Sequence, residues 1–126
     1  MNRTPSQHRR IIERRKHPRV FTPSGALISF KRPTNPAEIE EHSEGDGTLI
    51  ELSREGCRLL SDIPLKIGER HHLILQVSKK SHPIIVEAAV VRWIREHTHG
   101  LKFTSIQPIQ ESHLQEQLRE LRRPTH

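Results

Sequence analysis

Apolar and polar positions alternate along much of the chain in a pattern that predicts short strands. In the segment 71–77, Leu73, Leu75 and Val77 would share one face of a strand. A longer apolar run over residues 84–94 predicts a further strand, and the EHTHG that follows it predicts a turn. The other β-prone stretches are residues 20–30, 48–52, 57–60 and 101–103.

The period changes near the C-terminus. Pro108 suits the first position of a helix. Leu114, Leu118 and Leu121 then recur at helical spacing on one face, and Pro124 ends the pattern. Because no strand–helix–strand alternation precedes this helix, a parallel sheet is disfavoured. We therefore predict a mainly β fold, in which about six antiparallel strands close into a small barrel followed by one C-terminal helix.

Glycine, proline and charged residues mark the connections. Residues 33–47 are acidic and contain two prolines and two glycines, which predicts a long exposed loop. Gly25, within an apolar stretch, predicts a bulge or a close approach of another segment. Residues 1–13 are polar and basic with little periodicity, so we expect a flexible arm. The expected organisation is this arm, a barrel over residues 14–105, and a helix with its tail over residues 106–126.

The formal net charge of +6 is concentrated at one end of the sequence. Residues 1–20 contain seven Arg or Lys and one acid, whereas the remaining chain has 14 basic and 14 acidic residues. Proteins that bind a duplex usually spread basic residues over a face, and the four aromatic residues are too few for a platform that stacks single-stranded bases. A neutral body behind a cationic arm suits the capture of a compact anion, although a solvated tail has the same pattern. We expect no nucleic-acid partner.

Neither a membrane span nor a secretory signal is apparent in the sequence. No apolar run approaches the ~18 residues that a transmembrane helix needs, and the first twenty residues lack an apolar signal core. The single cysteine, Cys57, excludes an internal disulfide and suits a reducing compartment. We expect a cytoplasmic protein that does not insert into a membrane.

The motifs of common enzymes and metal sites are missing. The sequence contains no GxxxxGK[ST], GxGxxG, HExxH or GxSxG. Its ten histidines have no zinc-finger spacing; His97 and His99 would face the same side of a strand, whereas His71 and His72 would face opposite sides. Cys57 lies among apolar residues and is expected to be a small core residue. We predict no enzymatic activity, no metal site and no cofactor.

Two motifs carry candidate binding chemistry. RKHPR places Arg15 and Arg19 four residues apart where the basic arm enters the body, and ELSREG places Glu51, Ser53 and Gly56 at a turn between two strands. Arginine offers a planar fork of donors that grips a phosphate or the O6 and N7 acceptors of guanine. A carboxylate accepts from the donor edge of guanine, and a serine hydroxyl bonds a phosphate or ribose oxygen. Glycine permits positive φ and lets a ligand approach the backbone.

At these residues the sequence resembles the PilZ family, whose signature is RxxxR followed by [D/N]xSxxG. Arg15 and Arg19 match the first motif, and Ser53 and Gly56 match the second. Glu51 departs from the signature, because the family has Asp or Asn there. Glu51 keeps a carboxylate but adds one methylene, and a site about 1 Å too loose loses much of its function. The alternative for Glu51 is a solvated turn acid with no part in recognition.

The resemblance extends beyond the two motifs. ERRKHPRV at residues 13–20, VVRWI at 90–94 and GLKF at 100–103 are similar to the entry and closing strands of the family, and the resemblance covers residues 13–122. It implies a bacterial six-stranded PilZ-type β-barrel that binds the second messenger cyclic di-GMP and passes the signal to a protein partner.

Two further positions acquire roles from the resemblance. In the family, an arginine at the position of Arg14 is associated with binding a stacked pair of cyclic di-GMP molecules. Trp93, the one tryptophan, lies where the family often has one, and it would either stack on a guanine or simply pack on the barrel wall. The implied ligand-binding residues are Arg14, Arg15, Arg19, Glu51, Ser53, Gly56 and Trp93.

Other functions stay open at this point. The main alternative is a degenerate PilZ-like adaptor that binds a protein without nucleotide, and the glutamate at position 51 is the feature that favours it. A nucleic-acid-binding barrel would account for the high isoelectric point, but it conflicts with the confinement of excess charge to the arm. An enzyme has the least support.

Overall fold

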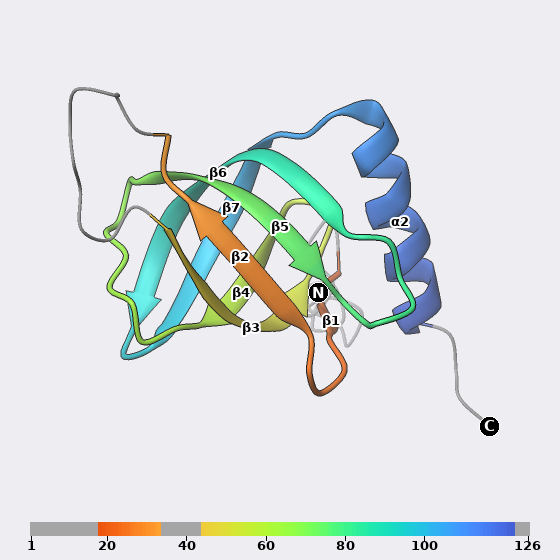
Figure 1. The fold of residues 1–126 in the computed structure, drawn as a ribbon, viewed down its shortest axis with the longest axis horizontal. Helices are drawn as coiled ribbons and strands as arrows, with labels where there is room; N and C mark the ends of the chain where they lie inside the picture. The colour runs from red at the N-terminus through yellow and green to blue at the C-terminus, as the bar shows by residue number, and fades with distance from the viewer. Residues whose placement is uncertain (1–17, 34–43, 123–126) are drawn as a thin grey trace, which may run out of the picture.

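Seven strands and one helix form within residues 18–33 and 44–122, the parts of the chain that the computed structural model describes (Figure 1). In chain order the elements are β1 (Val20–Phe21), β2 (Leu27–Lys31), β3 (Glu44–Leu52), β4 (Gly56–Leu60), β5 (Arg70–Gln76), β6 (Ile84–Arg95), β7 (Thr98–Ser105) and α2 (Pro108–Arg122).

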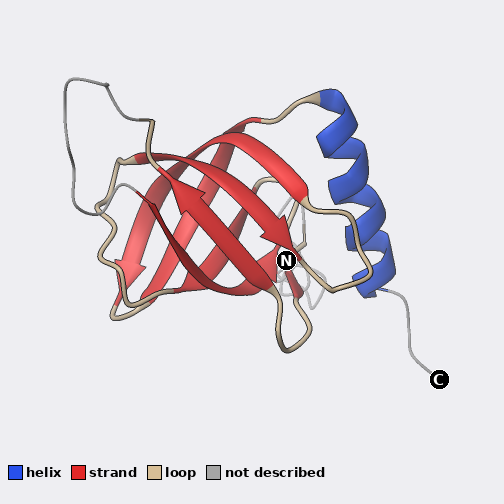
Figure 2. Cartoon of the chain, in the orientation of Figure 1, coloured by secondary structure: helices blue, strands red, loops and turns tan. Residues whose placement is uncertain are grey.

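Six of the strands close on themselves. β3, β2, β5, β6, β7 and β4 are hydrogen-bonded in that order, and β4 pairs again with β3. Every pairing is antiparallel. The short β1 adds to the end of β3, on the edge where β2 has stopped. The predicted six-stranded antiparallel barrel is therefore confirmed, and closure leaves these six strands without a long free edge (Figure 2).

The apolar side chains that the sequence places on one face of each strand fill the interior of the barrel. On β5, Leu73 and Leu75 are fully buried, and Ile74 between them faces outward. β2 repeats the pattern with Ile28 and Phe30 inside. Burial of one apolar face on each strand supplies most of the driving force for closure.

Helix α2 begins at Pro108, as the sequence predicts. Leu114 and Leu118 are buried, and Leu121 packs partly against the core, so the predicted helical face is the one that docks. The helix lies across one end of the barrel and contacts β1 and β6 (Figure 1). No helix in the described segments is long and apolar enough to span a membrane.

Two expectations for connecting residues were wrong. Strand β3 already begins at Glu44, inside the predicted loop 33–47, because its first residues pair one for one with β2. Gly47 fits this strand because a Cβ there would lie 2.5 Å from the backbone oxygen of Leu60. Gly25 marks neither a bulge nor a close approach. It has a φ of 92° and open space around it, so its role is to turn the chain between β1 and β2.

Candidate functional site

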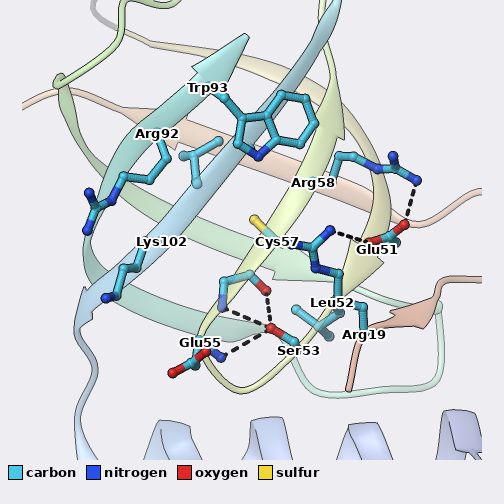
Figure 3. Close-up of a pocket in the computed structure, with 13 residues that line it drawn as sticks. Arg19, Glu51, Leu52, Ser53, Glu55, Cys57, Arg58, Arg92, Trp93 and Lys102 are labelled. Carbon is cyan, nitrogen blue, oxygen red and sulfur yellow. Dashed lines mark hydrogen bonds and ion pairs between the residues drawn. The ribbon is translucent and has the colours of Figure 1, made fainter. Parts of the chain in front are cut away.

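A row of cross-strand neighbours crosses the outer face of the barrel. Glu51 on β3 is opposite Arg58 on β4, Arg58 is opposite Gly100 on β7, and Gly100 is opposite Trp93 on β6. A pocket of about 300 Å³ lies over this row (Figure 3). Arg19, just before β1, and the turn between β3 and β4 complete its walls.

The carboxylate of Glu51 is the centre of one side of the pocket. Its Oε2 accepts a hydrogen bond from Nη2 of Arg58 at 2.5 Å, and its Oε1 lies 3.7 Å from Nη1 of Arg19. Glu51 is only 8% exposed and belongs to strand β3. It is therefore not the solvated turn acid that the sequence left open. Within the described segments its Oε1 is buried and accepts no hydrogen bond, and the guanidinium of Arg19 is its ion-pair partner.

The turn between β3 and β4 is held by Ser53. The Ser53 hydroxyl accepts hydrogen bonds from the backbone N–H groups of Glu55 and Gly56, both at 3.2 Å. The Ser53 N–H in turn donates to the carbonyl of Gly56 at 2.9 Å. A serine that bonds the backbone two and three residues ahead stabilises a turn locally. The contacts observed for Ser53 are thus those of a turn former at the pocket rim (Figure 3).

Gly56 has a different reason to be glycine from the one the sequence suggested. Its φ is not positive; among the described glycines only Gly25 and Gly68 have positive φ. A Cβ on Gly56 would instead lie 2.1 Å from the carbonyl oxygen of Leu101. The residue therefore allows β7 to approach the turn closely.

The same turn is tied to the C-terminal helix. Nη2 of Arg54 lies 3.0 Å from Oε1 of Glu111 in the first turn of α2. Both side chains are partly exposed to solvent, so the pair contributes little stability. It does connect the pocket rim to the helix that covers one end of the barrel.

The other side of the pocket is formed by Trp93 and two cations. The indole lies over Gly100, where a Cβ would be 2.2 Å from the ring. Pairing of β6 with β7 shifts register between Val91 and Trp93, so Arg92 is the extra residue of a β-bulge. Arg92 and Trp93 are both exposed and both line the pocket, together with Lys102 of β7 (Figure 3).

Beneath the pocket, Cys57 has no nucleophilic character. It is buried in the core cluster, and desolvation raises the pKa of its thiol to about 12. The thiol therefore stays protonated at neutral pH and is a poor nucleophile. This confirms the prediction of a small core residue.

The histidines do not assemble into a metal site in the described part of the chain, where no three His, Cys, Asp or Glu side chains form a group that could hold a metal ion. His71 and His72 face opposite sides, as expected, with His71 buried. The expectation that His97 and His99 share a face was wrong. The turn ending β6 includes His97, which is exposed, whereas His99 lies within β7 and is buried.

Five of the seven residues proposed from the sequence line this one pocket. They are Arg19, Glu51, Ser53, Gly56 and Trp93. Arg14 and Arg15 lie outside the described residues.

Among the lining residues missed by sequence reasoning, three are cationic: Arg58, Arg92 and Lys102. Arg58 could have been found, because a tight SREG turn places it across the hairpin from Glu51. Lys102 could have been found from its two-residue spacing from Gly100 on a strand. Arg92 had no such signal, because regular alternation would put it on the face opposite Trp93.

A family model and several solved structures are similar to the chain. The family model described as PilZ domain matches residues 13–120. No sequence among curated proteins matches the chain. Similar solved structures include the PilZ domain of YcgR from Escherichia coli with c-di-GMP, with a TM-score of 0.66 and 16% identity, covering 86% of this chain and 91% of that one.

Two longer proteins contain the same fold. The crystal structure of YcgR from Escherichia coli in complex with c-di-GMP matches with a TM-score of 0.67 and 19% identity, over 86% of this chain and 46% of that one. The inhibitor of motility MotI/DgrA from Bacillus subtilis matches with a TM-score of 0.58 and 20% identity, over 84% of this chain and 50% of that one. The chain thus spans about half the length of these two proteins, and at such identities the likeness concerns the fold.

Proposed function

The chain belongs to the PilZ domain family, and from this premise we propose that it is a cyclic di-GMP receptor that passes ligand binding on to a protein partner. The observation that carries the proposal is that Arg19 of the first family motif lines one pocket together with the residues at the second motif. Arg19 of the first motif lies 3.7 Å from Glu51 of the second, and Trp93 stands across the pocket from them. Two proteins with a similar fold support a receptor of this kind: YcgR, whose structure is in complex with c-di-GMP, and an inhibitor of motility.

The chemistry of the Glu51 side suits a guanine. Its Oε1 is a buried carboxylate oxygen that accepts no hydrogen bond from the described residues, and the guanine N1–H and N2 amino group present donors on one edge. The neighbouring fork of Arg19 offers donors for O6 and N7. A base held by both groups would leave its flat face free to stack on an aromatic ring such as Trp93.

Arg14 and Arg15 extend this proposal to residues outside the described segments. We expect the phosphates of the ligand to hold these two side chains at the pocket, beside Arg19. Engagement of these residues by the ligand would create a surface that a partner recognises, which is a common form of ligand-driven switching.

Calorimetric titration with cyclic di-GMP tests the proposal. We expect micromolar or tighter binding by the natural protein, and no binding of ATP or NAD. Arg19→Ala should weaken binding by roughly 5- to 150-fold, because a bidentate contact to guanine is worth about 1–3 kcal/mol. Arg15→Ala should have an effect of the same kind. Arg70→Ala, at an exposed arginine away from the pocket, is the matched control.

The same titration measures stoichiometry. With Arg14 present, we expect two ligands per chain at saturation. A clean one-to-one endpoint would refute the second ligand and leave the receptor proposal intact. Wild-type binding by both arginine variants would refute the recognition scheme itself.

One observation favours the second candidate, a PilZ adaptor that binds protein without nucleotide. Glu51 is already engaged within the chain by Arg58 and Arg19, so its charge is balanced before any ligand arrives. An absence of heat and of spectral change at high excess of cyclic di-GMP would refute the receptor and favour this alternative.

A further inference from the structure

The β-bulge in β6 has a consequence for charge at the pocket. In a regular strand Arg92 and Trp93 would point to opposite faces. Because Arg92 is the extra residue of the bulge, both side chains reach the outer face, while Val91 before them is fully buried. Bulges commonly redirect a side chain beside a binding site. The result is a guanidinium placed next to the exposed indole.

Lys102 reaches the same edge of the pocket from the neighbouring strand. It pairs with Val90 of β6 on one side and with Gly56 of β4 on the other, so no bulky side chain separates it from the pocket floor. Figure 3 shows the cationic ends of Lys102 and Arg92 on the same side of the pocket, away from Glu51.

The cations of the pocket differ in how their charge is balanced. Arg19 and Arg58 both pair with Glu51. No carboxylate from residues 18–33 or 44–122 forms an ion pair with Arg92 or Lys102. Two like charges on neighbouring strands repel each other, and an anion bound between them would remove this repulsion.

We infer that Arg92 and Lys102 form a phosphate subsite at the Trp93 edge of the pocket, separate from the two family motifs. A nucleotide base that stacks on the indole would carry its phosphate one sugar away from the ring, and Arg92 and Lys102 line the same pocket beside the indole. The ligand class is therefore a nucleotide phosphate. Its assignment to a phosphodiester of cyclic di-GMP rests on the proposed function.

The test compares two double variants with the same change in charge. Arg92→Gln/Lys102→Gln removes the subsite, and Arg95→Gln/Lys80→Gln removes two exposed cations that do not line the pocket. Each protein is titrated with cyclic di-GMP at low and at high salt. We expect the subsite variant to bind about tenfold more weakly or worse, with a difference that shrinks as salt screens the attraction. The control should bind like the natural protein.

A second probe separates this inference from the proposed function. Inorganic pyrophosphate carries no base, and its binding is followed by the NMR signals of the Trp93 indole N–H and the Lys102 amide. If the natural protein binds cyclic di-GMP and the subsite variant binds it equally well, the subsite is refuted and the receptor stands. If cyclic di-GMP does not bind to the natural protein, the receptor proposal is refuted, and the pyrophosphate titration tests the subsite on its own. Pyrophosphate-induced changes in chemical shift that appear in the natural protein and the control but not in the subsite variant would then support the subsite. An absence of such changes in the natural protein would refute it.

Discussion

The two sides of the pocket balance charge in opposite ways. On the Glu51 side, a buried carboxylate is held by Arg58 and Arg19, so the side chains are already fixed by one another. On the Trp93 side, Arg92 and Lys102 are exposed and have no carboxylate partner among the described residues. One side is organised within the chain, and the other is suited to be completed by an anion.

This difference predicts a division of labour. Fixed, buried hydrogen-bonding groups discriminate between ligands, because a wrong base would leave a buried polar group unpaired. Exposed cations attract any compact anion and make the association sensitive to salt. The Glu51 side should therefore determine which base binds, and the Trp93 side should contribute affinity for phosphate.

The largest effect on recognition should follow from changes at Glu51. Glu51→Ala should weaken cyclic di-GMP binding by about 1.5–3 kcal/mol, roughly 10- to 150-fold, because a charge-assisted hydrogen bond is lost. Glu51→Asp restores the residue that the family usually has, and should preserve or improve affinity. Calorimetry of the natural protein and both variants in one buffer at one salt concentration measures this.

Each alternative for Glu51 gives a different outcome in that series. Equal binding by all three proteins would mean that the Glu51 side does not read the base. No binding by the natural protein, with a gain in Glu51→Asp, would support the adaptor in which the longer side chain has abolished recognition.

Stability should separate the two sides in a second experiment. Arg58→Ala leaves Glu51 buried without its closest partner, and should lower the free energy of unfolding by about 1–3 kcal/mol. Arg92→Ala removes an exposed side chain and should stay within about 0.5 kcal/mol of the natural protein. Urea denaturation followed by far-UV circular dichroism measures both. Adding Glu51→Gln to Arg58→Ala should recover part of the loss, since it removes the buried charge; equal losses in Arg58→Ala and Arg92→Ala would contradict the contrast.

The sequence alone predicts the Glu51 side much better than the Trp93 side. Motif spacing and a tight turn suffice to bring Glu51, Ser53 and Gly56 to one place, and the hairpin register would also have placed Arg58 beside Glu51. These relations are local, so they depend on residues within a few positions of one another.

The Trp93 side depends on pairings between distant residues. The bulge that brings Arg92 and Trp93 to the same face exists only because β6 pairs with β7 in a shifted register, and no single-strand pattern contains that shift. The start of β3 at Glu44 was missed for a similar reason. Asp and Gly residues there indicate a loop locally, but pairing with β2 fixes them in a strand. The strands and the helix were predictable because their apolar periodicity reflects burial in one core.

The smallest effect on the pocket should come from pH, although pH should change the stability of the barrel. His71 and His99 are buried, and burial lowers the pKa of each imidazole below its ordinary value; Glu69 opposes this shift only partly at His71. The folded state thus binds protons less readily than the unfolded state, in which histidines have a pKa of about 6.5. The free energy of unfolding should be highest above that pH. It should decrease as the pH drops from about 6.5 toward the lowered pKa values of the two histidines in the folded state.

Urea denaturation between about pH 8 and pH 5.5 measures this slope. His71→Gln should make the slope shallower, whereas His72→Gln, at the less buried neighbour on the same strand, should leave it unchanged. Neither side of the pocket is lined by a described histidine, the side chain whose ordinary pKa falls in this range. Affinity for cyclic di-GMP should therefore stay nearly constant from about pH 8 to about pH 6.5, where the protein is fully folded. A marked change in affinity over that range would show that a titrating group outside the described segments takes part in binding, and that the two sides of this pocket do not account for recognition.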